Sequence, residues 1–207
     1  MPSVYDLVAW AYYATHARKA PDPARYVLGQ SGWVAAGARV LDYGGGEGRW
    51  AAELAGRAAA VVVADIDEAA LRRVPSHPRL ASVLVDGHTL PFRSQVFDVV
   101  FINHVLHHVE DLPAVLPELR RVVRRRGRLV IIEFHPEASL TRVYRFLSHF
   151  RRHPCIFYAP RALATLVNGA TFRVEAHGLD EFQYALVASR EESDGGLADR
   201  TKTSDAT

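Results

Sequence analysis

The chain has 207 residues, of which 49% are hydrophobic and 23% charged, and its formal net charge at pH 7 is +2. This composition is ordinary for a globular protein, and the length fits one domain with a sizeable core. No apolar run approaches the roughly 18 residues of a membrane span, and the first residues lack the pattern of a signal peptide. The single cysteine excludes an internal disulfide and a cysteine-based zinc cluster. We therefore predict a cytoplasmic protein without a membrane span.

The first half of the chain alternates helical and strand patterns. Apolar residues fall at helical spacing over residues 4–17, which predicts a helix within an N-terminal helical lid at residues 1–30. Short apolar runs that follow predict buried strands, separated by helical stretches. The predicted strands are residues 39–43, 61–65, 80–85 and 96–102, and the predicted helices are residues 47–57 and 68–74.

The second half continues the alternation and then changes. A helical stripe over residues 112–126 ends at Gly127, and a strand follows at residues 128–134. A helical insert is predicted at residues 136–160, and a helix at residues 161–168 has Gly169 as its cap. Residues 171–177 and 182–189 are predicted as antiparallel strands. The tail at residues 191–207 is rich in Gly, Ser, Asp and Thr and is predicted to be disordered.

This alternation predicts an α/β fold. We expect residues 1–190 to form a single doubly wound, Rossmann-like domain with a seven-stranded sheet, mostly parallel with an antiparallel last strand. Ligands of such sheets bind at the carboxyl ends of the strands, near the switch in strand order. The functional residues are therefore expected just after positions 43, 65, 85, 102 and 134.

A glycine-rich loop stands at the first of these positions. Residues 40–48 read Val-Leu-Asp-Tyr-Gly-Gly-Gly-Glu-Gly, and glycines let the backbone turn tightly and let a ligand approach closely. A dinucleotide fingerprint needs a glycine where Arg49 stands. A phosphate-binding P-loop needs Gly-Lys-Ser/Thr, which is absent here.

Residues 40–48 resemble motif I of the class I S-adenosylmethionine-dependent methyltransferases, and further motifs follow in order. These are Ala64-Asp65, Val85-Asp86-Gly87, Leu90-Pro91-Phe92, Phe97-Asp98-Val99-Val100, Leu106-His107-His108-Val109 and Glu118-Leu119-Arg120-Arg121-Val122-Val123. The later ones resemble the quinone-biosynthesis and related small-molecule methyltransferases. The turn that usually reads Lys-Pro-Gly-Gly in that subgroup is Arg125-Arg126-Gly127-Arg128 here. The resemblance covers roughly residues 38–135.

The resemblance implies S-adenosylmethionine as cofactor, no metal, and a set of cofactor-binding residues. It places both ribose hydroxyls on Asp65, the adenine amino group on Asp86, and the methionine part near Asn103. The remaining implied cofactor residues are Asp42, Gly44, Gly45, Gly46, Ile66 and Gly87. Each acid has an alternative role: Asp65 as a helix cap, Asp86 as a turn former, and Asp42 as a brace for the loop. For Asn103 the alternative is a simple turn residue.

Three histidines follow the fourth strand. His104, His107 and His108 are spaced to share one helix face, but no cysteine or acid stands at ligand spacing nearby, so we predict no metal site. His104 and His108 are candidates for a general base, because histidine titrates in the right range. Their alternative role is to shape the pocket and its backbone hydrogen bonds.

The function expected from the resemblance is methyl transfer to a small-molecule acceptor by in-line displacement. Aromatic residues in the lid and the insert suggest a partly apolar acceptor, although they also suit a plain core. Residues 120–152 are rich in arginine, which suits a solvated helix face and also leaves an anionic partner such as RNA open. A cofactor-binding protein without turnover and an NAD-dependent oxidoreductase are the alternatives. The chain is expected to be a monomer or a homodimer.

Overall fold

The computed structural model describes residues 26–27, 29–30, 34–149, 155–179 and 182–190. The predicted N-terminal lid lies almost wholly outside these residues, and so does the predicted tail at residues 191–207. Within the described part of the chain, no helix is both long and apolar enough to cross a membrane.

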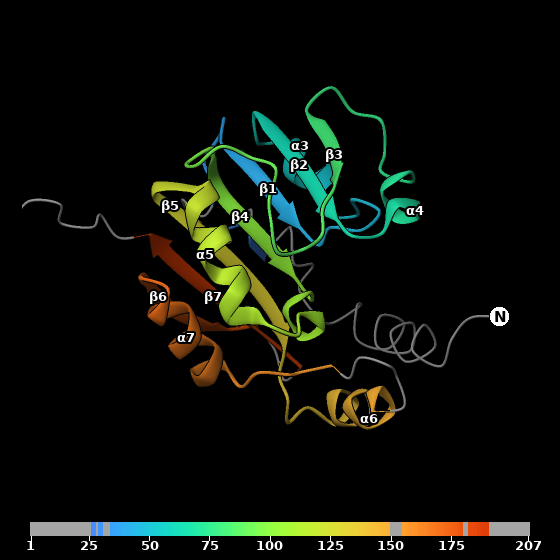
Figure 1. The fold of residues 1–207 in the computed structure, drawn as a ribbon, viewed down its shortest axis with the longest axis vertical. Helices are drawn as coiled ribbons and strands as arrows, with labels where there is room; N and C mark the ends of the chain where they lie inside the picture. The colour runs from blue at the N-terminus through green and yellow to red at the C-terminus, as the bar shows by residue number, and fades with distance from the viewer. Residues whose placement is uncertain (1–25, 28, 31–33, 150–154, 180–181, 191–207) are drawn as a thin grey trace, which may run out of the picture.

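Seven strands form one sheet in the order β3-β2-β1-β4-β5-β7-β6 (Figure 1). The strands are β1 (Arg39–Tyr43), β2 (Ala60–Asp65), β3 (Leu80–Leu84), β4 (Phe97–Asn103), β5 (Val123–Phe134), β6 (Phe172–Gly178) and β7 (Gln183–Arg190). Strands β1 to β5 run parallel, whereas β7 is antiparallel to both β5 and β6. The predicted α/β fold, with its mostly parallel seven-stranded sheet and antiparallel last strand, is confirmed. The strand order reverses between β1 and β4, which is the switch point where such sheets bind ligands.

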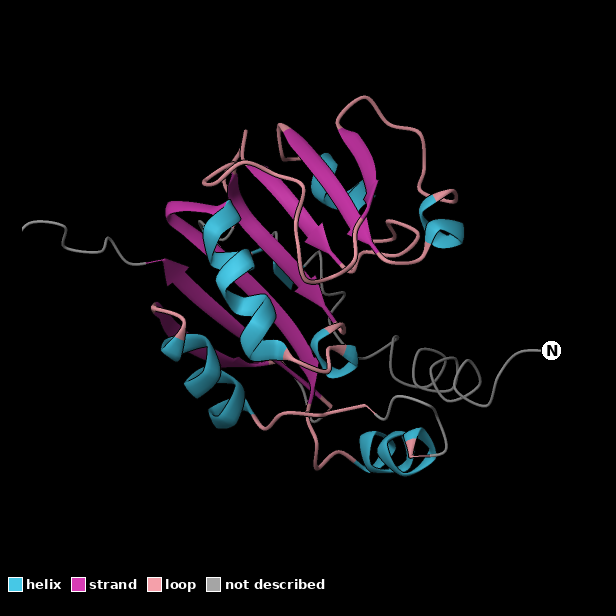
Figure 2. Cartoon of the chain, viewed as in Figure 1, coloured by secondary structure: helices cyan, strands magenta, loops and turns pink. Residues whose placement is uncertain are grey.

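Helices cover both faces of the sheet (Figure 2). They are α3 (Ala51–Ala55), α4 (Glu68–Leu71), the 3-10 helix η1 (Leu106–His108), α5 (Leu112–Val122), α6 (Ser139–Ser148) and α7 (Pro160–Gly169). Successive strand residues point to opposite faces, so Leu41 and Ile131 pack in the cluster of α5 and α7. Val40 and Val130 pack in the cluster of α3. The continuous apolar runs of the strands are thus explained by burial on both sides.

The helix predicted at residues 47–57 is shorter in the structure. Gly44, Gly46 and Gly48 all have positive φ, between 54° and 72°, and a left-handed backbone cannot belong to a right-handed helix. The loop therefore extends past Gly48, and α3 begins only at Ala51.

The prediction that a helix continues to residue 126 and ends at Gly127 is wrong. Helix α5 ends at Val122, and Val123 is extended, with ψ 135°, because it already pairs with Phe97 of β4. Gly127 lies inside β5, where a Cβ would come within 2.9 Å of the Asp98 carbonyl oxygen. The glycine thus permits close approach of two strands at an irregular point of their register, instead of capping a helix.

The cap predicted at Gly169 is also wrong, by one residue. Gly169 is the last residue of α7, and Ala170 is the cap. Thr171, which follows the cap, has a left-handed backbone with φ 62°.

Arg121 holds residues 90–92, in the segment that follows β3. Its guanidinium donates to the Leu90 carbonyl at 2.9 Å and to the Phe92 carbonyl at 2.7 Å. Glu118 accepts from the Arg121 Nε at 2.7 Å and from the Leu90 amide at 3.1 Å. The hydrogen bond from Arg121, which outweighs partial burial, holds the pKa of the Glu118 carboxyl below its usual value. The Glu-x-x-Arg pattern of α5 is therefore a clamp on residues 90–92, which position the loop after β3.

Candidate functional site

The loop after β1 depends on glycine for its backbone. Gly44 and Gly46 have φ 72° and 54°, a region that residues with a side chain rarely adopt. A Cβ on Gly44 would lie 2.5 Å from the methyl carbons of Val105. The Gly44 amide donates to the Ala64 carbonyl at 2.7 Å, so the loop turns toward the carboxyl end of β2.

Asp65, the last residue of β2, holds this loop from the side. Its Oδ2 accepts a hydrogen bond from the Gly46 amide at 2.7 Å, and its Oδ1 accepts one from the Asp67 amide at 2.9 Å. The cap of α4 is Asp67, which accepts from the amides of Ala69 and Ala70. The alternative role of Asp65 as the helix cap is therefore filled by its neighbour.

Asp42 lies buried beneath the glycine loop, with only 1% of its surface exposed. Burial, followed by the charge of Asp65, raises the pKa of Asp42 from 3.8 to about 7. Its Oδ2 lies close enough to Gly45 to overlap a Cβ there. Among the described residues, that oxygen has no hydrogen-bond partner. A buried oxygen of this kind favours an incoming donor or cation.

The loop after β3 carries Asp86 and Gly87. The Tyr43 hydroxyl donates to the Gly87 carbonyl at 2.6 Å, which joins this loop to β1. Asp86 Oδ1 accepts from the Thr89 amide at 2.7 Å and from the His88 amide at 2.9 Å. These bonds lower the pKa of the exposed Asp86 carboxyl and show that Asp86 does form the turn.

An apolar side chain lies next to this turn. Ile66, directly after β2, is 70% exposed, and its Cγ2 would lie 3.7 Å from a Cβ on Gly87. An exposed isoleucine beside a glycine with φ 85° leaves an apolar surface that a flat ring can contact.

Asn103 and His104 end β4. The Asn103 Oδ1 is buried and, within the described part of the chain, lacks a hydrogen-bond partner. His104 has a left-handed backbone, with φ 55°, and its ring stacks on Phe134 with centroids 3.8 Å apart. Its Nε2 lies 3.1 Å from the Gln183 Oε1. Since an amide oxygen only accepts, Nε2 carries the proton.

A buried pair, His107 and Glu133, fixes the 3-10 helix. The His107 Nδ1 lies 2.8 Å from the Glu133 Oε2, and the two side chains are 3% and 4% exposed. Glu133 Oε1 accepts from the Leu106 amide at 2.7 Å. Burial alone would raise the pKa of Glu133, but the charge and hydrogen bond of His107, with help from His104 and that amide, hold it below its usual value.

Sequence reasoning missed Glu133, although a signal for it exists. It is the only acid in the apolar run at the end of the predicted strand 128–134. A carboxylate in such a position is rarely buried without a partner.

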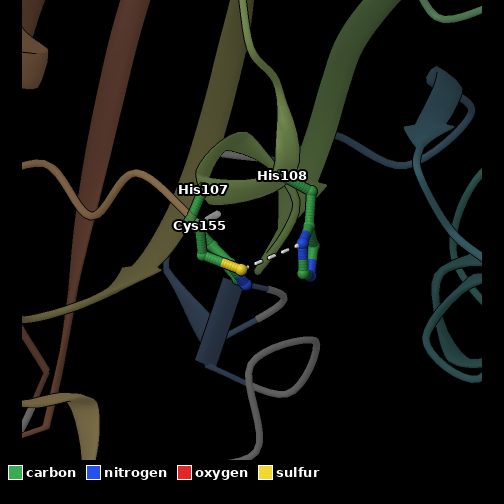
Figure 3. Close-up of side chains that lie close together, drawn as sticks. All are labelled: His107, His108 and Cys155. Carbon is green, nitrogen blue, oxygen red and sulfur yellow. Dashed lines mark hydrogen bonds between the residues drawn. The ribbon is translucent and has the colours of Figure 1, made fainter. Parts of the chain in front are cut away.

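The interpretation that three histidines share a helix face is wrong. Only Leu106–His108 is helical, and His104 stands before it with left-handed backbone. His108 is exposed, and its Nδ1 lies 3.4 Å from the Cys155 Sγ (Figure 3). The three rings therefore have different partners, namely Gln183, Glu133 and Cys155.

The predicted insert brings aromatic rings to the carboxyl ends of β4 and β5. Helix α6 lies beyond these strand ends (Figure 1). Phe157, in the segment after α6, stacks on His107 with ring centroids 4.8 Å apart. Tyr144 of α6 meets Phe157 edge-on at 5.6 Å. Together with the stacked pair of His104 and Phe134, these rings form what we call the aromatic region.

Arginines of the basic segment pack at the other end of the sheet. Arg120 donates to the Thr171 hydroxyl, and Arg124 pairs with Asp98 at 2.8 Å. Arg124, Arg126 and Arg128 line a depression of about 370 Å³ near the start of β1 and β4. The predicted site residues all lie at the opposite, carboxyl ends of the strands.

The structure thus groups the predicted site residues into two sets along one edge of the sheet. Asp42, Asp65 and the glycine loop lie together at β1 and β2, with Ile66, Asp86 and Gly87 next to them. Asn103, His104 and His108 lie at or just after the end of β4, where His104 contacts Gln183 and His108 contacts Cys155.

Comparison with known proteins bears on the arrangement of this site. Residues 41–131 match the family described as "Methyltransferase domain", a stretch that runs from β1 into β5. The predicted resemblance to the class I S-adenosylmethionine-dependent methyltransferases is thus confirmed over this part of the chain. S-adenosylmethionine is the cofactor of this family.

Two curated relatives are similar over the same part of the chain. The chain is 40% identical over 112 residues to a demethylmenaquinone methyltransferase of Clavibacter sepedonicus, covering 52% of this chain and 46% of the relative. It is 39% identical over 105 residues to a malonyl-[acyl-carrier protein] O-methyltransferase of Halorhodospira halophila, covering 48% and 36%. The matches thus span half or less of the length of these relatives.

A solved structure shows the same fold over most of the chain. A SAM-dependent methyltransferase from Aquifex aeolicus superposes with a TM-score of 0.70 at 16% identity, covering 89% of this chain and 97% of that one. At this identity the likeness concerns the fold alone.

Proposed function

We propose that the chain transfers the methyl group of S-adenosylmethionine to a small, partly apolar aromatic acceptor of the quinol type. The observation that carries this proposal is the contact between Asp65 and the Gly46 amide at 2.7 Å. It joins an acid at the end of β2 to a glycine loop at the switch point of the sheet. The aromatic region at the end of β4 lies next along the same edge.

We assign the cofactor to the carboxyl ends of β1, β2 and β3. Asp65 would accept hydrogen bonds from the ribose hydroxyls, since a carboxylate with two oxygens suits a diol. Ile66, Gly87 and Asp86 would hold the adenine ring and its amino group. The glycine loop, Asp42 and Asn103 would surround the methionine part. The unsatisfied oxygens of Asp42 and Asn103 support this, because the amino group supplies donors and a positive charge.

The chemistry asked of the protein is mainly alignment. The bound cofactor supplies a methyl group that is already activated on a sulfonium. The chain must then hold the acceptor in line and keep water out, which side chains on rigid strand ends do well.

The aromatic region supports a flat acceptor. The half-buried rings of His104, Phe134 and Phe157, the last stacked on the buried His107, have faces and edges that suit another aromatic ring. The name of the Clavibacter sepedonicus relative, demethylmenaquinone methyltransferase, points to the same class of acceptor.

His104 is the better candidate for a general base. Its Nε2 carries the proton that Gln183 accepts, and its Nδ1, which is buried in this structure, would take a proton from an acceptor hydroxyl in a conformation that exposes this nitrogen. His108 is oriented toward Cys155 instead.

We propose a small molecule rather than a nucleic acid as the partner. Arg120, Arg121 and Arg124 of the basic segment bind Thr171, Glu118 and Asp98 within the fold. These contacts support the interpretation of this segment as an ordinary structural surface. A homodimer or a monomer would serve this function equally.

Methyl transfer from labelled S-adenosylmethionine tests the proposal. We expect a reduced, demethylated naphthoquinone to gain one methyl group on a ring carbon, with one S-adenosylhomocysteine formed per product, in preference to catechol, a small amine or an acyl thioester. Replacing His104 with Gln is expected to lower kcat roughly 100-fold, because a positioned base typically contributes that much. The half-buried His77, which precedes β3 at the opposite end of that strand, provides the matched control His77→Gln, which should keep full activity.

Two results would contradict the proposal. If the acyl thioester alone were methylated, with a malonyl group as the acyl part, the acceptor would be the carboxylate of that malonyl group and not a quinol. Tight cofactor binding with no labelled product from any acceptor would favour a cofactor-binding protein without turnover.

A further inference from the structure

Three side chains that bind metal ions well converge beside the aromatic region: His107, His108 and Cys155. One ligand atom from each residue lies within 4.8 Å of the other two. Figure 3 shows the Cys155 thiol next to the His108 ring, with His107 close behind. The cysteine comes from the segment between α6 and α7, and the histidines come from η1, so folding alone brings them together.

The backbone holds these residues in place. The Ile156 amide donates to the His107 carbonyl at 2.8 Å, which pins the cysteine segment to η1. The Cys155 amide donates to the Ser148 Oγ at 3.2 Å, and Ser148 is fully buried. The thiol is therefore positioned by its neighbours on both sides, as a preorganised site requires.

The spacing of the ligand atoms suits one ion. The Cys155 Sγ and the His108 Nδ1 lie 3.4 Å apart. On a tetrahedral Zn²⁺ ion, with Zn–S about 2.3 Å and Zn–N about 2.0 Å, a sulfur and a nitrogen ligand lie about 3.5 Å apart. A ligand atom of the third residue, His107, lies within 4.8 Å of both.

Glu133 contacts the ring nitrogen of His107 that does not face the proposed ion. It binds the His107 Nδ1 at 2.8 Å, which leaves Nε2 as the nitrogen that can bind an ion. A carboxylate behind a metal-binding histidine fixes the tautomer and the ring orientation, and it makes the imidazole a stronger ligand.

We propose that His107, His108 and Cys155 bind one divalent ion of the Zn²⁺ class. Thiolate and imidazole ligands select such ions over Mg²⁺ and Ca²⁺, which prefer oxygen. Three protein ligands leave a fourth position, which opens toward solvent on the side of the exposed His108. The ion would tie the segment between α6 and α7 to η1. The proposal is separate from methyl transfer, which the family carries out without a metal.

Cobalt binding tests this site directly, because the chain has a single cysteine. We expect the untagged full chain to bind one Co²⁺ with a thiolate-to-cobalt charge-transfer absorption, which only Cys155 can produce. Zn²⁺ should displace the cobalt and remove the band, since it binds more tightly to such ligands, whereas excess Mg²⁺ should not.

Matched variants separate this site from chance binding by surface histidines. Cys155→Ser should abolish the band, and His108→Asn, at an exposed position, should weaken binding at least about 10-fold. His77→Asn should leave both unchanged. Circular dichroism confirms that each variant is folded.

Two outcomes would overturn the metal site. One is the absence of the band in the wild-type chain, which leaves the contact between Cys155 and His108 as an ordinary hydrogen bond. The other is a band of unchanged affinity in folded His108→Asn. Neither outcome bears on cofactor binding, which is measured separately with S-adenosylhomocysteine.

Discussion

Replacing Asp65 with Asn is expected to weaken S-adenosylhomocysteine binding roughly 100-fold. A charged acceptor contributes about 1.5–3 kcal/mol per hydrogen bond, and 100-fold in affinity corresponds to about 2.7 kcal/mol. Asn keeps the size of the side chain and retains one oxygen that can still accept from the Gly46 amide. The glycine loop should therefore stay in place while the charge that favours the ribose hydroxyls is lost. Isothermal titration calorimetry measures the change.

Glu68→Gln is the matched control for Asp65→Asn. Glu68 is an exposed acid at the start of α4, three positions after Asp65, and it pairs with Arg72 across one helical turn. Removing the charge of Glu68 changes the electrostatic potential at the carboxyl ends of the strands and leaves the contacts of the glycine loop intact. The affinity of Glu68→Gln for S-adenosylhomocysteine should stay within about twofold of wild type, because exposed ion pairs contribute little to stability or binding. If Asp65→Asn and Glu68→Gln bound S-adenosylhomocysteine with equal affinity, the assignment of Asp65 to the ribose hydroxyls would be wrong.

Replacing Gly45 with Ala is expected to destabilise the fold by about 3 kcal/mol. The new Cβ would overlap the buried carboxyl of Asp42 and approach Val63 Cγ1 to 2.9 Å. Neither neighbour has room to retreat, because Asp42 and Val63 are both buried, and overpacking in a tight core typically costs about 1–3 kcal/mol. For a chain of this size, such a loss lowers Tm by roughly 6–12 °C. Thermal unfolding followed by circular dichroism records it.

Gly169→Ala provides the contrast for Gly45→Ala. No atom lies within 4 Å of a Cβ at Gly169, and its φ is not in the left-handed region. Alanine favours helix more than glycine, so the Tm of this variant should stay level or rise slightly. A similar fall of Tm in both variants would show that crowding beneath the glycine loop is not the cause.

Much of the fold was predictable because its main signals are local. Strand β2 and most of β4 are apolar runs, as burial on both faces requires, and these strands end at Asp65 and Asn103. The acids at the ends of β2 and β3 therefore stand out by position. The contact between Asp65 and the glycine loop confirms that two motifs far apart in the sequence meet.

Helix boundaries were less predictable, because pairing partners decide them. Val123 continues the helical apolar stripe of α5, yet it joins β5 because Phe97 of β4 lies alongside to pair with it. The choice between a last helical turn and a strand extension thus depends on a neighbour about 25 residues away. Local spacing does not contain that information.

The histidine region was the least predictable part of the site. The even spacing of His104, His107 and His108 suggests one helix face, but the left-handed backbone of His104 separates it from the other two. Cys155 reaches His108 across 47 positions. The prediction of no metal site considered only ligands near in sequence, and the approach of a distant cysteine motivates the opposite proposal.

Calorimetric titration of the wild-type chain with S-adenosylhomocysteine and with NAD tests the central claim most directly. We propose that the glycine loop binds an adenosyl amino acid, since Asp65 accepts from the Gly46 amide and Arg49 stands where a dinucleotide loop has glycine. We predict one S-adenosylhomocysteine bound per chain and no measurable heat with NAD. Binding of NAD without binding of S-adenosylhomocysteine would contradict the account.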